Sequence, residues 1–163
     1  NAAMHIDSDG LKITFPPLPP SFPGEPSKEE CYKAFPDWYG KRLGEVNCLT
    51  CSMNTTEAGE KAPKLVRRCT GWHESTHVNQ CHSMGGIGYC CCMVSEGCRA
   101  CAEAEAYGQS VTCAQNILAG KLPLLETEKP LSKEEELALR CYLRGAFREL
   151  VDATEKCLNW GLQ

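Results

Sequence analysis

Thirteen cysteines in a chain of 163 residues constrain the fold of this protein more than any other feature of its sequence. Such a density is typical of proteins that are stapled by disulfides in an oxidising compartment outside the cell. Because the total is odd, at most six intramolecular disulfides can form, and at least one thiol is left over. The sequence therefore predicts a secreted, disulfide-rich protein with one odd cysteine that could link to another chain. The cysteines are at positions 31, 48, 51, 69, 81, 90, 91, 92, 98, 101, 113, 141 and 157.

Three of these cysteines, Cys90, Cys91 and Cys92, are consecutive. Adjacent Cα atoms are about 3.8 Å apart, which is closer than the usual Cα separation across a disulfide. The three should therefore not pair with one another, and we expect three different segments to converge on them.

The most informative motif for function is His73-Glu74-Ser75-Thr76-His77, which matches the zinc-peptidase pattern HExxH. Two histidines four residues apart share one face of a helix, so both imidazoles can bind a single Zn²⁺ at about 2.0–2.1 Å. The glutamate beside the first histidine then lies next to the metal-bound water. The motif predicts one zinc ion bound by His73 and His77, with Glu74 as the general base.

A catalytic zinc needs three protein ligands and one open position, so a further donor must come from elsewhere in the fold. The segment 103–109 offers two glutamates, Glu103 and Glu105. Two residues along a helix turn the side chain by about 200°, so only one of them can face the metal. His82 is a poorer candidate, because five residues past His77 place it about 140° around the helix.

Together, the motif and this segment resemble the glutamate-type zincins, the thermolysin-like branch of zinc metallopeptidases. The sequence is still more similar to small bacterial and fungal zincin-like proteins that pair His-Glu-x-x-His with a later Glu-x-x-Ala-Tyr-x-Gln segment. The resemblance covers about residues 65–118 and favours Glu103 over Glu105 as the third ligand. It implies metal ligands at His73, His77 and Glu103 and a general base at Glu74, with Ala106, Tyr107 and Gln109 matching the rest of the later segment.

The activity that follows is hydrolysis of peptide bonds in a peptide or protein substrate. Zinc polarises the carbonyl and activates water, and Glu74 takes the proton of that water and passes it to the leaving amine. The tetrahedral oxyanion needs a further hydrogen-bond donor, for which Tyr107 and His82 are the candidates.

Two other functions are compatible with the same residues. One is a non-catalytic, secreted, disulfide-rich binding or effector protein. The other is a RING-like module with two structural zinc ions, which requires reduced thiols. Its ligands would be Cys48, Cys51, Cys69, His73, His77, Cys81, Cys98 and Cys101.

The overall composition narrows the class of partner. The net charge is −4 and no run of basic residues is longer than Arg67-Arg68, so the sequence favours neither nucleic acid nor an anionic membrane as partner. No apolar stretch approaches the 18 or so residues of a membrane span. We expect a monomer, and a start at Asn1 without a signal peptide is typical of a processed chain. Asn54-Thr55-Thr56 is an acceptor sequence for N-glycosylation, which predicts a secreted glycoprotein.

The fold expected from the sequence is mainly α, or α+β with a small sheet, in which a zincin-like helix pair is stapled by disulfides. We predict a proline-rich, extended N-terminal arm at 1–27 and a single domain at 28–163. A capping box at Ser132 and Glu135 begins the clearest helix, whose apolar stripe includes Leu139, Leu143, Phe147, Leu150, Val151 and Leu158. The other predictions are helices from Ser27, at 62–83 and at 97–119, irregular loops at 45–62 and 84–98, a linker at 121–130 and short strands at 12–15 and 64–66.

Overall fold

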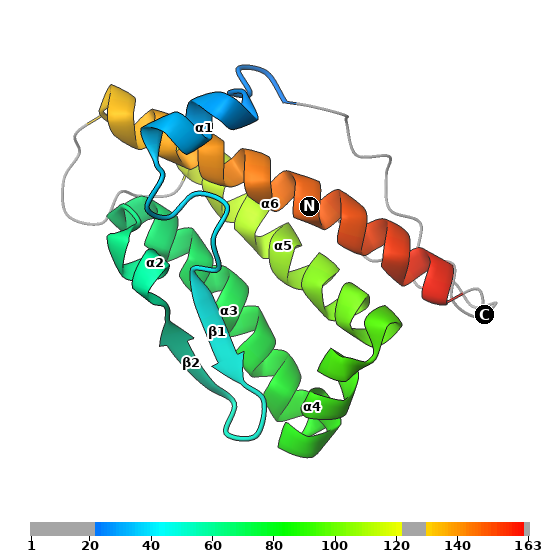
Figure 1. Cartoon of the computed structure of the whole chain (residues 1–163). Helices are drawn as coiled ribbons and strands as arrows, with labels where there is room; N and C mark the ends of the chain where they lie inside the picture. Colours follow the sequence, from blue (N-terminus) through cyan, green and yellow to red (C-terminus); the bar gives the residue numbers. More distant parts are fainter. Residues whose placement is uncertain (1–21, 122–129, 162–163) are drawn as a thin grey trace.

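The computed structural model describes residues 22–121 and 130–161, which form six helices and one two-stranded antiparallel sheet (Figure 1). The prediction of a mainly α protein with a small sheet is thus confirmed. The predicted strand at 12–15 lies outside the described residues, as do residues 1–21 of the arm and 122–129 of the linker. In chain order the elements are α1 (Lys28–Ala34), β1 (Gly44–Asn47), β2 (Ser52–Thr55), α2 (Glu57–Lys61), α3 (Lys64–Met84), α4 (Gly86–Val94), α5 (Glu96–Leu118) and α6 (Lys133–Trp160).

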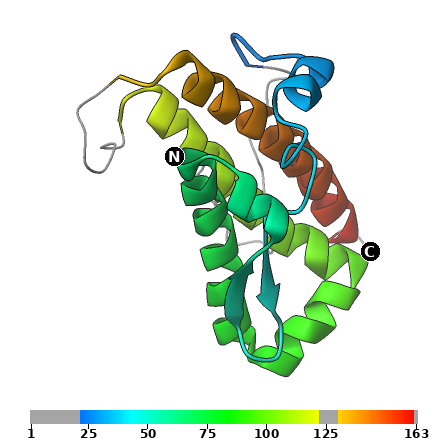
Figure 2. The same ribbon diagram turned by 60° about the vertical axis from the view of Figure 1, so that its left-hand side comes forward.

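Three long helices, α3, α5 and α6, make up the body of the protein, and α5 lies between the other two (Figures 1 and 2). The sequence predicted both ends of α3 and α5 to within about two residues, and it predicted where α6 begins. The capping box of α6 is present, since Ser132 and Glu135 bond reciprocally through side chains and backbone. Its predicted apolar stripe is buried from Leu139 to Leu150, whereas Val151 and Leu158 are partly exposed.

The segment 45–62, predicted to be an irregular loop, instead contains the β-hairpin and α2. The sequence carries no alternating signal here, because all four residues of β2 are exposed. The turn is held by the Asn47 side chain, which accepts hydrogen bonds from the backbone N–H groups of Leu49 and Thr50 at 3.0 and 3.1 Å. The predicted strand at 64–66 is also wrong, because these residues form the first turn of α3.

The described cysteines form six disulfides, and the one left over, Cys91, is exposed. As predicted, the three consecutive cysteines do not pair with one another. Two segments converge on them rather than three, because Cys90 pairs with the hairpin turn and Cys92 with the start of α5. The pairs are Cys31–Cys141, Cys48–Cys90, Cys51–Cys81, Cys69–Cys113, Cys92–Cys98 and Cys101–Cys157.

Residues 84–98 were predicted to be a loop, but most of them form the helix α4. Glycine and cysteine are poor helix formers, so the local sequence argued against a helix. Two disulfides hold α4 to the hairpin and to α5, and buried Tyr89 packs against Cys51 and Cys81. Tertiary contacts therefore override the local preference.

The end of the predicted arm that the structure describes, residues 22–27, lies against α6. Glu25 forms ion pairs with Arg144 and Arg148 at 3.5 and 3.0 Å. Ser27 then caps α1 as predicted. Within the described ranges, no helix is both long and apolar enough to cross a membrane.

Candidate metal centre

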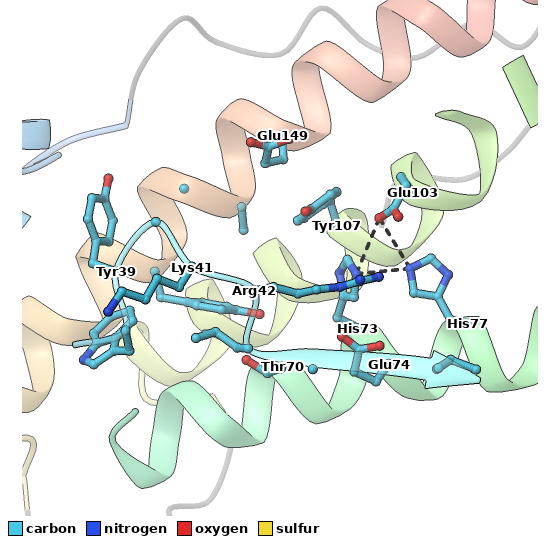
Figure 3. A pocket seen from close by; sticks show the side chains of 18 of the residues that line it. Tyr39, Lys41, Arg42, Thr70, His73, Glu74, His77, Glu103, Tyr107 and Glu149 are labelled. Atoms are coloured by element: carbon cyan, nitrogen blue, oxygen red, sulfur yellow. Dashed lines mark hydrogen bonds and ion pairs between the residues drawn. The ribbon is translucent and has the colours of Figure 1, made fainter. Parts of the chain in front are cut away.

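Three side chains from two helices converge at one point of the structure (Figure 3). His73 and His77 come from successive turns of α3, and Glu103 comes from α5. The Nε2 atoms of the two histidines are 3.1 Å apart. The Nε2 atom of His73 lies 3.5 Å from Oε2 of Glu103, and that of His77 lies 3.4 Å from it. Ligands placed tetrahedrally about 2.0–2.1 Å from a zinc ion are about 3.3 Å from one another. The three atoms therefore have the spacing of three ligands on a tetrahedral zinc ion.

The hydrogen bonds of Gln80 determine which nitrogen of His77 carries a proton. The Gln80 amide donates to the backbone carbonyl of Ala102 at 3.1 Å and to Glu105 at 2.8 Å. Its oxygen is left to accept, and it lies 2.8 Å from Nδ1 of His77. Nδ1 is thus the protonated nitrogen, and in the neutral imidazole Nε2 presents a lone pair to the centre.

Ser110 acts on His73 in the same way. Its hydroxyl donates to the backbone carbonyl of Ala106 at 3.4 Å and accepts from the Tyr142 hydroxyl at 3.1 Å. The same oxygen lies 3.2 Å from Nδ1 of His73, which donates to it. The Nε2 atom of His73 therefore also presents a lone pair.

Two imidazole lone pairs and a carboxylate consequently face one another with no donor among them, an arrangement that requires a cation. A proton can take that place. Burial lowers the pKa of His77, but the hydrogen bond and charge of Glu103 outweigh burial and raise it overall. Burial would raise the pKa of Glu103, but the contacts that His73 and His77 make with it when they are protonated outweigh burial and lower the pKa to about 2. A divalent metal ion satisfies all three groups at once.

The predicted general base, Glu74, lines the pocket that holds these three residues, a cavity of about 540 Å³. It is 6% exposed, and burial raises the pKa of its carboxyl group despite the nearby imidazoles. Gly44 of β1 lies directly over it, because a Cβ atom at that position would be only 2.7 Å from a Glu74 carboxylate oxygen. The hairpin can approach α3 this closely because residue 44 has no side chain.

Of the two predicted oxyanion donors, the structure brings only Tyr107 to the pocket. Its ring lies edge-to-face with the ring of His73, with centroids 4.5 Å apart. Burial raises the pKa of Tyr107, so its hydroxyl keeps a proton at neutral pH and can donate it in a hydrogen bond. His82 is exposed near the end of α3 and does not line the pocket, so its candidacy was wrong.

The structure also decides between the alternatives for the metal ligands. Glu103 faces the two histidines, whereas Glu105 is exposed and accepts a hydrogen bond from Gln80 instead. The RING-like arrangement is wrong for this structure, because all six of its cysteines are paired in disulfides.

Sequence reasoning missed the residues that support the ligands. Gln80 had a usable signal, because a residue three positions after His77 lies on the same face of the helix. Ser110 had none, since it is 37 residues from His73 in the chain.

Comparison with known proteins found no matching family model, no similar curated protein and no similar solved structure. The resemblance to glutamate-type zincins therefore stays a prediction that rests on the residues quoted above. The structure itself defines a buried group of two histidines and one glutamate that could hold a metal ion.

Proposed function

We propose that this protein is a secreted metallopeptidase that hydrolyses peptide bonds with one zinc ion bound by His73, His77 and Glu103. One observation carries the proposal: both Nε2 lone pairs and the carboxylate are aimed at one point, at the spacing of zinc ligands. Two imidazoles and one carboxylate are a usual ligand set of catalytic zinc, and they leave a fourth position open.

The residues around this point supply the remaining chemistry of amide hydrolysis. When bound, zinc activates water and polarises the scissile carbonyl. Glu74 accepts the proton of the attacking water and delivers it to the leaving amine; burial raises its pKa toward the range that suits a general base. Tyr107 donates a hydrogen bond to the oxyanion that forms on the former carbonyl oxygen.

Six intrachain disulfides indicate an oxidising compartment, which supports secretion. The predicted glycosylation site is compatible with it, because Asn54 is exposed on β2. We expect a monomeric glycoprotein that acts on exposed peptide segments.

Metal analysis and proteolysis of the wild type and three variants test the proposal. The wild type should contain one zinc per chain and cleave a denatured protein substrate. Glu74→Gln should keep the zinc and lose cleavage, whereas Glu103→Ala should weaken zinc binding about 10- to 100-fold or more, as loss of even a supporting group does. Glu155→Gln, the same change as at position 74 but on an exposed residue of α6, should match the wild type.

Unchanged proteolysis by Glu74→Gln would remove that residue from the mechanism. A protein that binds zinc but cleaves no substrate would favour the non-catalytic binding or effector function. A protein that binds no zinc would reject the metal centre altogether.

A further inference from the structure

One arginine extends into the pocket of the metal centre. Arg42 belongs to the segment between α1 and β1, and Figure 3 shows its side chain reaching toward the labelled residues of the centre. The backbone of this segment is anchored, because the carbonyl oxygens of Arg42 and Leu43 accept hydrogen bonds from the side chain and the backbone N–H of Thr56. The guanidinium group is thus attached to a fixed wall of the pocket.

Among residues 22–121 and 130–161, the guanidinium group of Arg42 makes only a weak ionic contact. It lies 3.9 Å from the Glu45 carboxylate, and the two side chains are 72% and 51% exposed. An ion pair that is this long and this exposed contributes little to the stability of the protein. By contrast, Arg140 of α6 is bound to Glu136 by two hydrogen bonds, at 3.0 and 2.8 Å. Arg42 therefore retains a planar set of N–H donors whose geometry matches a carboxylate.

The charges of the pocket favour an anionic group beside Arg42. A divalent cation at the metal centre offsets the two carboxylates of Glu74 and Glu103, which leaves the guanidinium as excess positive charge. Lys41 adds a second cation to the same wall, while Glu149, the third acidic residue of the lining, comes from α6 (Figure 3).

We propose that Arg42 binds a carboxylate of the substrate next to the scissile bond. The group is either the side chain of an aspartate or glutamate or the free C-terminal carboxylate of the peptide. The inference rests on the proposed function and adds a substrate class to it: peptides that are acidic at the position beside the cleaved bond.

A matched series of fluorescence-quenched peptides tests the inference. The members carry Glu, Gln or Lys at the positions flanking the cleaved bond, and a second pair ends next to that bond in a free acid or an amide. For the zinc-loaded wild type, kcat/KM should be about 10- to 100-fold higher for the carboxylate member of one set, the value of a hydrogen bond to a charged group. Which set shows the preference identifies the source of the carboxylate.

Three substitutions assign the effect to the guanidinium group. Arg42→Gln should abolish the preference, mainly through KM, and Arg42→Lys should restore part of it because the charge returns without the planar geometry. Arg67→Gln removes an identical charge from an exposed position of α3 outside the pocket, and it should keep the full preference. The zinc-loaded Glu74→Gln variant should bind the carboxylate peptide more tightly than its neutral partner in calorimetry, which tests recognition without turnover.

The outcomes separate this inference from the proposed function. Cleavage of all peptides at equal rates would overturn the carboxylate site and leave the peptidase intact. A fall in kcat for every peptide in Arg42→Gln would also overturn it, because the arginine would then stabilise the oxyanion. Absence of cleavage, together with equal binding of charged and neutral peptides, would overturn both.

Discussion

Replacement of Gln80 by leucine is expected to weaken zinc binding about 10- to 100-fold, because the change removes the group that orients His77. Gln80 is 8% exposed and makes three hydrogen bonds, to His77 and Glu105 at 2.8 Å each and to the carbonyl of Ala102 at 3.1 Å. Leucine has nearly the same volume but leaves the Nδ1–H of His77 without a partner, at about 1–3 kcal/mol for a buried group. The Ala102 carbonyl keeps its hydrogen bond within α5 and loses only the additional one from Gln80.

Only part of that cost should appear in metal affinity. The loss of the two hydrogen bonds that link Gln80 of α3 to Ala102 and Glu105 of α5 lowers the stability of the metal-free protein. The freed His77 imidazole appears as weaker zinc binding of about 1.4–2.7 kcal/mol, the energy of a 10- to 100-fold change. Competition against a fluorescent chelator measures the affinity, and urea unfolding of the metal-free protein measures the stability.

The matched control is Gln109→Leu, the same substitution in the same groove between α3 and α5 but at an exposed residue. It should leave zinc affinity within about twofold of wild type, the usual range for surface substitutions. Equal affinities for Gln80→Leu and Gln109→Leu would refute the reasoning, even if the first variant were less stable, because Gln80 would then only hold the two helices together.

Three further predictions follow from other parts of the structure. Gly44→Ala should reduce peptidase activity about 10- to 100-fold with zinc retained, because its Cβ would lie 2.7 Å from the Glu74 carboxylate. The control is Gly71→Ala in α3, where a Cβ atom would have no other atom within 4 Å. Equal activities of the two variants would contradict the prediction. Zinc affinity, measured from about pH 5 to pH 8, should decline as the pH falls through a value above 6.5, because the pKa of His77 is raised and protons compete with the metal; a decline that begins only below 6.5 would contradict this. Replacing Cys31 and Cys141 by serine removes a disulfide with a sequence separation of 110 and should lower the free energy of unfolding by about 4–5 kcal/mol. The same change at Cys92 and Cys98, whose separation is 6, should lower it by about 2 kcal/mol. Equal losses in urea unfolding would show that loop entropy is not the cause.

Elements whose signals lie within a few residues were predictable. The capping box of α6 and its apolar stripe depend on spacings of three and four residues, and so does the placement of His73 and His77 on one face of α3. These patterns report the helical period, which is local.

The hairpin and α4 could not be predicted from their sequences. Residues 52–55 are all exposed, so no alternation of apolar and polar residues marks β2. In α4 the glycines and cysteines argue against a helix, and the disulfides from Cys90 and Cys92 outweigh them. The signal in both cases comes from residues that are distant in the chain.

The sequence alone determined the class of the framework and the chemistry that is available: a mainly helical chain with cysteines for six disulfides, and two histidines at the spacing of one metal ion. Only the tertiary structure decided that Glu103 rather than Glu105 meets them, that Gln80 and Ser110 hold their rings, and which cysteines pair. The physical reason is range: helix periodicity and capping act over three or four residues, whereas a site that joins α3 to α5 exists only after the two helices have packed together.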